Sequence, residues 1–394
     1  MTSSYSLIEK KAHLKLEEIK EIIRLDYEGK LGQSVGLYDG DFGALLFLCK
    51  LIELDDKLMP VVEYFSQKFT QKLLSTSNSL TFCSGLSGCL YILEYFQRQD
   101  IMEVEIDQSI NFDKILLKKL EVEMANNHYD ILHGALGIGL YFLNKGDSKI
   151  VNKIIDYLLE SAEVDKNKNI YKWKSKLNRE GEIGFNISLS HGIAGIVVFL
   201  SKLIKEKSNR ESDLEKMLLG AINYIDSQRL DDNYYSFFPY QSKQNQSESR
   251  LAWCYGDLGV GICYWTAGCA LNDVELKSKA IDILLASTKR TSFEQTQIED
   301  AGICHGSAGV CLIFRRMYIE TNISEFHEAS LYWLERTLDF AEFDDGLAGY
   351  KTNMGGIWQK DYSLLTGISG IGLVLASVIL DDDQKWDEIL LLSI

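Results

Sequence analysis

The chain has 394 residues, of which 46% are hydrophobic and 25% are charged, and its formal net charge is −16. These fractions are typical of a globular protein, and the acidity argues against a broad nucleic-acid-binding surface, which needs clustered basic residues. The chain has only two prolines, which excludes collagen-like and proline-rich stalk structures. Scarce proline suits a mostly helical chain, because proline breaks helix interiors.

Two kinds of helical stretch alternate along the chain. The first kind is amphipathic and predicts helices that bury one face. In chain order, the amphipathic stretches are Leu14–Tyr27, Val61–Leu74, Ile115–Met124, Ile150–Leu159, Leu214–Gln228, Leu276–Thr288 and Glu328–Ala341.

The second kind is an apolar run opened by Gly-x-x-Gly, which predicts a helix that is buried nearly all round. The glycine pairs are Gly40/Gly43, Gly85/Gly88, Gly134/Gly137, Gly192/Gly195, Gly256/Gly259, Gly306/Gly309 and Gly367/Gly370. One such pair is a weak signal. Seven pairs, whose first glycines lie 45 to 64 residues apart, indicate a repeat architecture.

Strict alternation of seven amphipathic and seven buried helices predicts an all-α fold. We expect an α/α toroid, in which residues 1–394 form a single domain with seven inner helices inside seven outer ones. An open solenoid is the alternative. An open solenoid would expose one flank of its apolar inner helices to solvent, whereas a closed ring buries that flank.

Three longer stretches between helices are expected to be insertions on one rim of the ring, where repeat proteins build binding faces. Residues 165–189 alternate polar and apolar and predict short strands or an extended loop. Residues 230–250 are first aromatic and then polar, and residues 344–363 predict a turn-rich hairpin.

The sequence also bears on the compartment. Met1–Ile22 is charged and shows no secretory signal, and the apolar stretch Ile368–Leu380 is shorter than the roughly 20 residues of a membrane span. We therefore expect a cytoplasmic protein. In such a protein the eight cysteines are expected to be thiols or metal ligands rather than disulfides.

Two cysteines and a histidine occupy matching places in neighbouring repeats. Cys254 lies two residues before Gly256, Cys304 lies two residues before Gly306, and His305 follows Cys304. Repeat geometry places the two thiols at the same height, which predicts one zinc ion with an open fourth position, the pattern of catalytic zinc. The alternative is two buried cysteines and a helix-capping histidine.

The predicted donor set indicates thiol activation. Two thiolates and a neutral imidazole make a formally neutral zinc site, and a thiol that enters it is deprotonated while it stays nucleophilic. A zinc-bound water would instead indicate a hydrolase. Thiolate ligands make zinc a poorer Lewis acid, which favours thiol activation.

Other polar residues precede the same glycines. His191 is equivalent to His305 in the repeat before Cys254, and it could transfer a proton near neutral pH or merely bond backbone at a helix start. His133 is equivalent again, one repeat further away, and Asp130 lies in its loop. Arg250 and Tyr255 flank Cys254 and could bind an anionic oxygen. Cys83 also lies two before a repeat glycine and is interpreted as structural.

The segments WCYGDLGVG (Trp253–Gly261), CHGSAG (Cys304–Gly309) and SHGIAG (Ser190–Gly195) resemble signatures of the lanthionine synthetase C-like family. The resemblance covers essentially the whole chain. It implies an α/α toroid with one zinc ion bound by Cys254, Cys304 and His305. It also implies an active-site histidine at His191, an aspartate at Asp130, and an arginine and tyrosine at Arg250 and Tyr255.

In bacterial members, the resemblance implies cyclisation of dehydrated lanthipeptide precursors. A peptide cysteine adds to dehydroalanine or dehydrobutyrine and forms a thioether ring. The implied partner is the precursor peptide with its leader. Association with a dehydratase and an ABC transporter, which would bring the chain to the membrane periphery, is left open by the sequence.

Three other functions remain as alternatives. A related enzyme that adds glutathione to dehydrated protein residues would share these residues, and a zinc-bearing scaffold would keep the fold without turnover. A toroidal glycosidase would need paired acids on the rim, for which Asp39, Asp41 and Asp257 are the candidates.

Overall fold

The computed structural model describes residues 2–27, 34–76, 79–102, 110–178, 180–242, 247–381 and 385–393. The chain divides into two compact units. Unit 1 comprises Met1–Leu116 and Glu299–Gln384, and unit 2 comprises Leu117–Ile298 and Lys385–Ile394. The two units are described one after the other.

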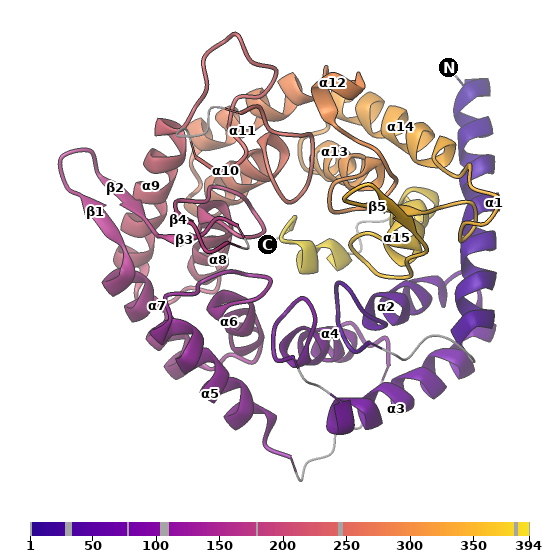
Figure 1. The fold of residues 1–394 in the computed structure, drawn as a ribbon, viewed down its shortest axis with the longest axis horizontal. Helices are drawn as coiled ribbons and strands as arrows, with labels where there is room; N and C mark the ends of the chain where they lie inside the picture. Colours follow the sequence, from indigo (N-terminus) through magenta and orange to yellow (C-terminus); the bar gives the residue numbers. More distant parts are fainter. Residues whose placement is uncertain are drawn as a thin grey trace. The chain divides into compact units, whose positions relative to one another are not determined.

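Unit 1 joins elements from both ends of the sequence. Its elements are α1 (Thr2–Tyr27), α2 (Phe42–Leu51), η1 (Asp56–Leu58), α3 (Met59–Thr76), α4 (Leu86–Arg98), α13 (Ser307–Thr321), α14 (Ser324–Asp339), β5 (Thr352–Met354), β6 (Ile357–Gln359) and α15 (Ile368–Leu380). Helix α13 packs on α14, and α2 packs on α3. The last apolar helix, α15, contacts α1, α2 and α13, so its amphipathic partner is the first helix of the chain (Figure 1).

Unit 2 consists of successive helix pairs. Its elements are α6 (Ala135–Asn144), α7 (Ser148–Ser161), β1 (Glu163–Asp165), β2 (Ile170–Lys172), β3 (Ser175–Lys176), β4 (Ile183–Gly184), α8 (Ile193–Lys205), α9 (Glu211–Ser227), α10 (Asp257–Leu271), α11 (Val274–Ser287), α12 (Phe293–Thr296) and η3 (Lys385–Leu390), and α5 (Phe112–Ala125) spans the boundary in sequence. Helices pair as α6 with α7, α8 with α9, and α10 with α11. The apolar helix α8 also contacts the apolar helices α6 and α10.

The predicted alternation of helices is confirmed in the described part of the chain. Each apolar run forms a helix, and each amphipathic stretch also forms a helix. The bounds of the amphipathic helices differ from the prediction by a few residues, except that α1 begins about three turns earlier than predicted. All ten residues of α2 are buried, whereas α7 buries only one stripe of its surface. This difference follows from hydrophobic periodicity, since an all-round apolar helix must be enclosed by others.

Glycine is required where the loops turn into the apolar helices. A Cβ atom on the second glycine of three pairs, Gly88, Gly309 and Gly370, would lie 1.9 Å from a backbone carbonyl oxygen six residues earlier. Gly256, which precedes α10, has a φ of 88°, a region that favours glycine. The repeated glycines therefore allow each loop to fold tightly over the start of its helix.

The three longer stretches between helices contain short strands and loops where they are described. Residues 165–189 contain parts of two antiparallel hairpins, β1–β2 and β3–β4, and residue 179 lies outside the described residues. The predicted hairpin in 344–363 is β5–β6. In 230–250 the described part is a loop with one bridge between Pro239 and Glu248, and residues 243–246 lie outside the description.

None of the helices, as far as the structure describes the chain, is long and apolar enough to cross a membrane.

Candidate active site

The loops that precede the apolar helices share a hydrogen-bonding pattern, in which positions are counted back from the first glycine of each pair. At position −2, the backbones of neighbouring repeats are hydrogen-bonded within each unit. The bonds are Ser190 N to Cys254 O (3.4 Å) in unit 2, and Cys304 N to Leu365 O (2.8 Å), Leu365 N to Tyr38 O (3.0 Å) and Tyr38 N to Cys83 O (2.9 Å) in unit 1. Equivalent residues of neighbouring repeats thus lie side by side within a unit.

Position −4 caps the end of its own loop. The side chains of Thr81, Ser188 and Ser363 accept hydrogen bonds from the backbone N–H three residues later, at 3.1 to 3.4 Å. Asp130 holds this position in its loop, and its Oδ1 accepts from His133 N at 2.8 Å. By this contact alone, Asp130 is a loop-capping residue.

Asp130 differs from these capping residues because a carboxylate has a second oxygen. Its Oδ2 lies 2.6 Å from Nδ1 of His191, which belongs to the next repeat. The Asp130 side chain is 13% exposed and that of His191 is 29% exposed, so the pair is partly shielded from water. The structure therefore brings together two residues that the family resemblance implied as active-site residues.

The Asp130–His191 contact favours an ion pair. Burial lowers the pKa of His191, but the hydrogen bond and charge of Asp130, together with Cys254, outweigh burial and raise that pKa above its usual value. Burial raises the pKa of Asp130, but the bonds to His191 and the backbone of His133 lower it overall. A histidine held in this way can give up a proton from its other nitrogen, Nε2.

Aromatic rings at position −1 form a row in unit 2. The rings of His133 and His191 are stacked with centroids 5.8 Å apart, and His191 and Tyr255 lie 6.0 Å apart at a tilt of 41°. Tyr240 stacks on Tyr255 at 4.1 Å, and Asn186 Nδ2 donates to the Tyr255 hydroxyl at 3.4 Å. Burial raises the pKa of Tyr255, which keeps its hydroxyl protonated.

Arg250 lies at position −6 of the loop that carries Cys254 and Tyr255. The equivalent residues Asn186, Asp300 and Asp361 each accept a hydrogen bond from the backbone N–H two residues later. A guanidinium has no acceptor, and Arg250 Nε is buried with no hydrogen-bond partner among the described residues. A buried donor of this kind indicates a place for an acceptor from a ligand.

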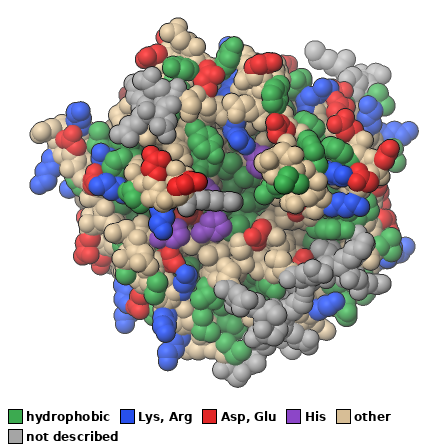
Figure 2. Space-filling view, viewed as in Figure 1, with side chains coloured by type: hydrophobic (Ala, Val, Ile, Leu, Met, Phe, Trp, Pro, Cys, Tyr) green, Lys and Arg blue, Asp and Glu red, His purple; other side chains and the backbone are tan. Residues whose placement is uncertain are grey.

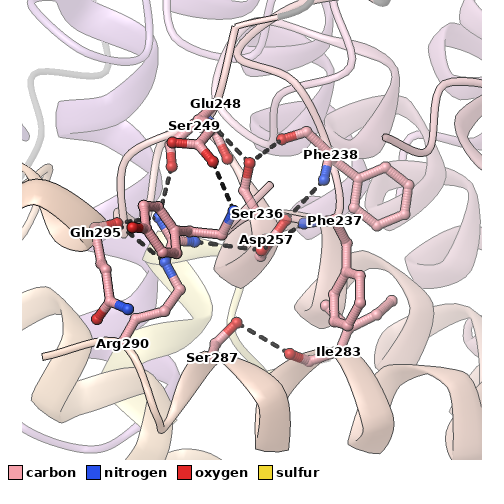
Figure 3. A network of polar contacts seen from close by, with 11 residues as sticks. Ser236, Phe237, Phe238, Glu248, Ser249, Asp257, Ile283, Ser287, Arg290 and Gln295 are labelled. Carbon is pink, nitrogen blue, oxygen red and sulfur yellow. Dashed lines mark hydrogen bonds and ion pairs between the residues drawn. The ribbon is translucent and has the colours of Figure 1, made fainter. Parts of the chain in front are cut away.

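A buried ion pair lies beneath this loop (Figure 3). Arg290 Nη1 is 3.2 Å from Asp257 Oδ2, and their side chains are 5% and 1% exposed. Asp257 also accepts from the backbone of Phe237 and Phe238, each at 3.0 Å, while Arg290 Nη2 donates to the carbonyl of Ser249 at 2.6 Å.

This network ties Phe237, Phe238 and Ser249 to the first turn of α10. Asp257 is therefore not a rim acid of the kind that a glycosidase needs, because it is buried and paired with Arg290.

The predicted zinc ligands belong to different units. Cys254, in unit 2, is 7% exposed, and its carbonyl accepts from both N and Oγ of Ser190. In unit 1, Cys304 is half-buried, and His305 Nε2 lies 3.8 Å from Asp300 Oδ2. Across the described residues, no group of three or more His, Cys, Asp or Glu side chains is placed to hold a metal ion. The zinc site stays a prediction.

A cleft of about 700 Å³ opens beside Asp130 in unit 2. Its walls come from the loop after α5 and from the β3–β4 hairpin, and they include His128, Tyr129, Asp130, Lys174, Lys176 and Ile183. Histidine side chains gather on the face of the molecule that Figure 2 shows. The cleft has the size of ordinary ligand sites and leads to the carboxylate that holds His191.

Sequence reasoning missed several of these contacts. Asn186 and Tyr240, which contact Tyr255, lie in insertions that do not repeat, and Arg290 follows Asp257 by 33 residues with no shared motif. His133 was identified only as the equivalent residue one repeat further away, and the structure shows that its ring stacks on His191. Aligning the seven loops on their first glycines would have shown both the capping position of Asp130 and the row of residues at −1.

The charge of Asp130 is expected to control His191. In Asp130→Asn the carboxylate that raises the pKa of His191 is lost while burial still lowers it, so this pKa should fall. NMR titration of the His191 imidazole measures the change. Ser188→Ala is the matched control, since it removes the cap on His191 N without changing charge. An unchanged His191 pKa in Asp130→Asn would contradict the assignment.

Comparison with known proteins identifies the family and the fold of the chain. The family model described as "Lanthionine synthetase C-like protein" matches residues 33–391. "Nisin biosynthesis protein NisC" of Lactococcus lactis subsp. lactis is 25% identical over 397 residues, which cover 88% of this chain and 85% of that protein. The solved structure of a nisin cyclase superposes with a TM-score of 0.73 at 20% identity, covering 96% of this chain and 98% of that one. This likeness shows a shared fold and confirms the predicted all-α fold class.

Proposed function

The chain belongs to the lanthionine synthetase C-like family, and from this premise we propose that it is a zinc-dependent lanthipeptide cyclase. The proposed reaction is the intramolecular addition of a peptide cysteine thiolate to dehydroalanine or dehydrobutyrine, which forms a lanthionine or methyllanthionine ring. The observation that carries the proposal is the Asp130–His191 pair, whose loop is hydrogen-bonded to Cys254 through Ser190. This connection supports the proposal that a proton donor and a metal-binding cysteine act in one site.

The residues proposed to hold zinc are Cys254, Cys304 and His305. A zinc ion with these ligands would keep an entering thiol deprotonated and nucleophilic. Two observations support the donor set. Both cysteines hold position −2, where backbones of neighbouring repeats meet within each unit. Asp300 Oδ2 lies 3.8 Å from His305 Nε2, and a carboxylate near the ring can orient a metal-binding histidine.

His191 is proposed to supply the proton that completes the addition. When the C–S bond forms at Cβ of the dehydrated residue, the electron pair of the C=C bond moves towards the carbonyl and leaves an enolate. His191, whose Nδ1 is held by Asp130, delivers the proton from Nε2 to Cα. The raised pKa of His191 keeps the proton available near neutral pH.

Arg250 and Tyr255 are proposed to stabilise the enolate oxygen. Arg250 Nε is a buried donor without a partner among the described residues, and Tyr255 keeps its hydroxyl proton because burial raises its pKa. Donors already in place where negative charge develops lower the barrier without reorganisation.

The proposed partner is a dehydrated precursor peptide with its leader, acting in the cytoplasm. The cleft of about 700 Å³ beside Asp130 offers room for part of that peptide. Association with a dehydratase and an ABC transporter at the membrane periphery is proposed as the wider setting of the reaction.

The test uses a dehydrated lanthipeptide precursor peptide that contains free cysteines. After incubation with the protein, free cysteines are alkylated and counted by mass spectrometry, and ring formation protects them. His191→Ala should slow ring formation by about 100-fold or more, the usual range for loss of a general acid. His13→Ala, an exposed histidine on α1, is the matched control and should match the wild type.

Two outcomes would contradict the proposed function. Cysteines that stay open to alkylation with the wild-type protein would exclude cyclisation. Glutathione adducts on the dehydrated residues, formed in place of rings when glutathione is supplied, would identify the glutathione-adding enzyme instead.

A further inference from the structure

We propose that His133 is a positioning residue for His191, whose imidazole it holds in a fixed plane by stacking. The inference rests on the proposed function, in which His191 delivers a proton to carbon. The residue is assigned from two observations in unit 2: a carboxylate that both histidines contact and a pair of nearly parallel rings.

The shared carboxylate is Asp130. Its Oδ1 accepts from the backbone N–H of His133 at 2.8 Å, and its Oδ2 binds Nδ1 of His191 at 2.6 Å. The two histidines therefore sit on opposite oxygens of one side chain. Any movement of the His133 backbone would displace the group that holds His191.

The stacked ring supplies a constraint that the carboxylate cannot. One hydrogen bond to Nδ1 fixes a point on the His191 imidazole but leaves its plane adjustable. The His133 ring lies nearly parallel to it, 5.8 Å away at 19°, within the range of favourable aromatic pairs. Tyr255 also contacts His191, but at a tilt of 41°. The parallel contact with His133 therefore sets the direction of Nε2.

The loop cap uses the backbone of residue 133 rather than its side chain. Asp130 caps the loop through the backbone N–H of residue 133, which any residue except proline would supply. The side chain is exposed and so fills no core. Two neighbouring loops of unit 1 also make a contact at position −1, where Ser84 Oγ donates to Asp39 Oδ2 at 2.5 Å. The repeat thus brings the side chains at position −1 of neighbouring loops into contact. Because residue 133 is a histidine, this contact is between two nearly parallel rings.

The kinetic test compares three variants on the dehydrated precursor peptide. His133→Ala removes the stacking ring and should lower kcat by about 10-fold with little change in KM, as expected from losing an aromatic contact. His133→Phe keeps a flat ring without ring nitrogens and should restore kcat to within about 2-fold of wild type. His13→Ala is the control for a histidine outside the site.

Each contrary result overturns the assignment. A kcat for His133→Ala within about 2-fold of wild type would show that stacking does not position His191. A His133→Phe protein as slow as His133→Ala would show that a ring nitrogen of His133 acts, rather than its face.

A second readout does not depend on turnover. In ¹⁵N-labelled wild-type protein, His191 should show a slowly exchanging Nδ1–H signal, because this proton is bound to Asp130. In His133→Ala this signal should broaden or be lost, and in His133→Phe it should persist. If the wild-type protein forms no rings, the proposed function fails, while this NMR comparison still decides the positioning role. A sharp Nδ1–H signal retained in His133→Ala would overturn it.

Discussion

Cys304→Ala is expected to yield a folded protein that lacks stoichiometric zinc and closes thioether rings more than about 100-fold more slowly, because loss of even an outer-shell partner of a metal costs 10- to 100-fold. Removing a thiolate leaves two protein ligands for an ion that prefers four partners. Zinc content is measured by elemental analysis of the purified protein, and ring formation by alkylation and mass spectrometry.

Cys83→Ala is the matched control for this variant. Cys83 also occupies position −2 in unit 1. Like Cys304, it takes part in the backbone hydrogen bonds between neighbouring repeats: the Cys83 carbonyl accepts from Tyr38 N, and Cys304 N donates to the Leu365 carbonyl. It has no histidine after it, so its loss should leave zinc content unchanged. Wild-type zinc content and ring formation in Cys304→Ala would overturn the metal assignment, and zinc loss in both variants would indicate a structural effect.

Arg290→Met is expected to destabilise the protein by about 3–5 kcal/mol, the usual cost of removing one partner of a buried ion pair. Methionine keeps much of the side-chain volume but leaves the Asp257 carboxylate buried without its cation. It also removes the donor to the Ser249 carbonyl, next to Arg250. The free energy of unfolding is measured by urea denaturation.

Arg210→Met is the control, because Arg210 makes two ion pairs at the surface, with Asp156 and Asp213. Exposed pairs contribute about 0–1 kcal/mol, so this variant should lose little. If both variants lose the same free energy of unfolding, the buried Arg290–Asp257 pair contributes no more to stability than the exposed pairs of Arg210.

The same pair predicts how stability depends on pH. Burial raises the pKa of Asp257 to about 6, although Arg290 and two backbone N–H groups lower it. The folded state therefore holds this proton more tightly than the unfolded state, and its contribution to stability is lost as pH rises towards 6.

Without Arg290, the pKa of Asp257 should rise further, so the deficit of Arg290→Met should be larger at pH 8 than at pH 5. The double variant with Asp257→Asn should lose this pH dependence. A deficit that is the same at both pH values would contradict the explanation.

Much of the fold could be predicted because its signals are local and repeated. The helix α2 is apolar along its whole length and is fully buried, and α7 shows one apolar stripe and buries that stripe. The glycines mark the start of each apolar helix, and in three of the pairs a Cβ atom on the second glycine would lie 1.9 Å from a backbone carbonyl oxygen. Periodicity and steric need are both properties of short segments, so the sequence reveals them.

The candidate site was predictable only as far as the repeat extends. Counting back from Gly192 and Gly256 identified His191, Cys254 and Tyr255. The same counting shows that Asp130 holds the loop-capping position −4. In other loops this position is held by Thr81 and Ser188, which cap with a hydroxyl group. Nothing in the sequence states that its second oxygen binds the neighbouring repeat, since this depends on the distance between two loops.

The sequence by itself determined the helices, their alternation and the equivalence of Cys254 with Cys304, because each follows from residue type at a fixed spacing. Tertiary structure alone decided that Asp130 holds His191, that His133 stacks on the same ring, and that Asp257 is neutralised by Arg290. These contacts join segments 33 to 61 residues apart, or rings on successive loops, and their partners are selected by packing rather than by any local pattern.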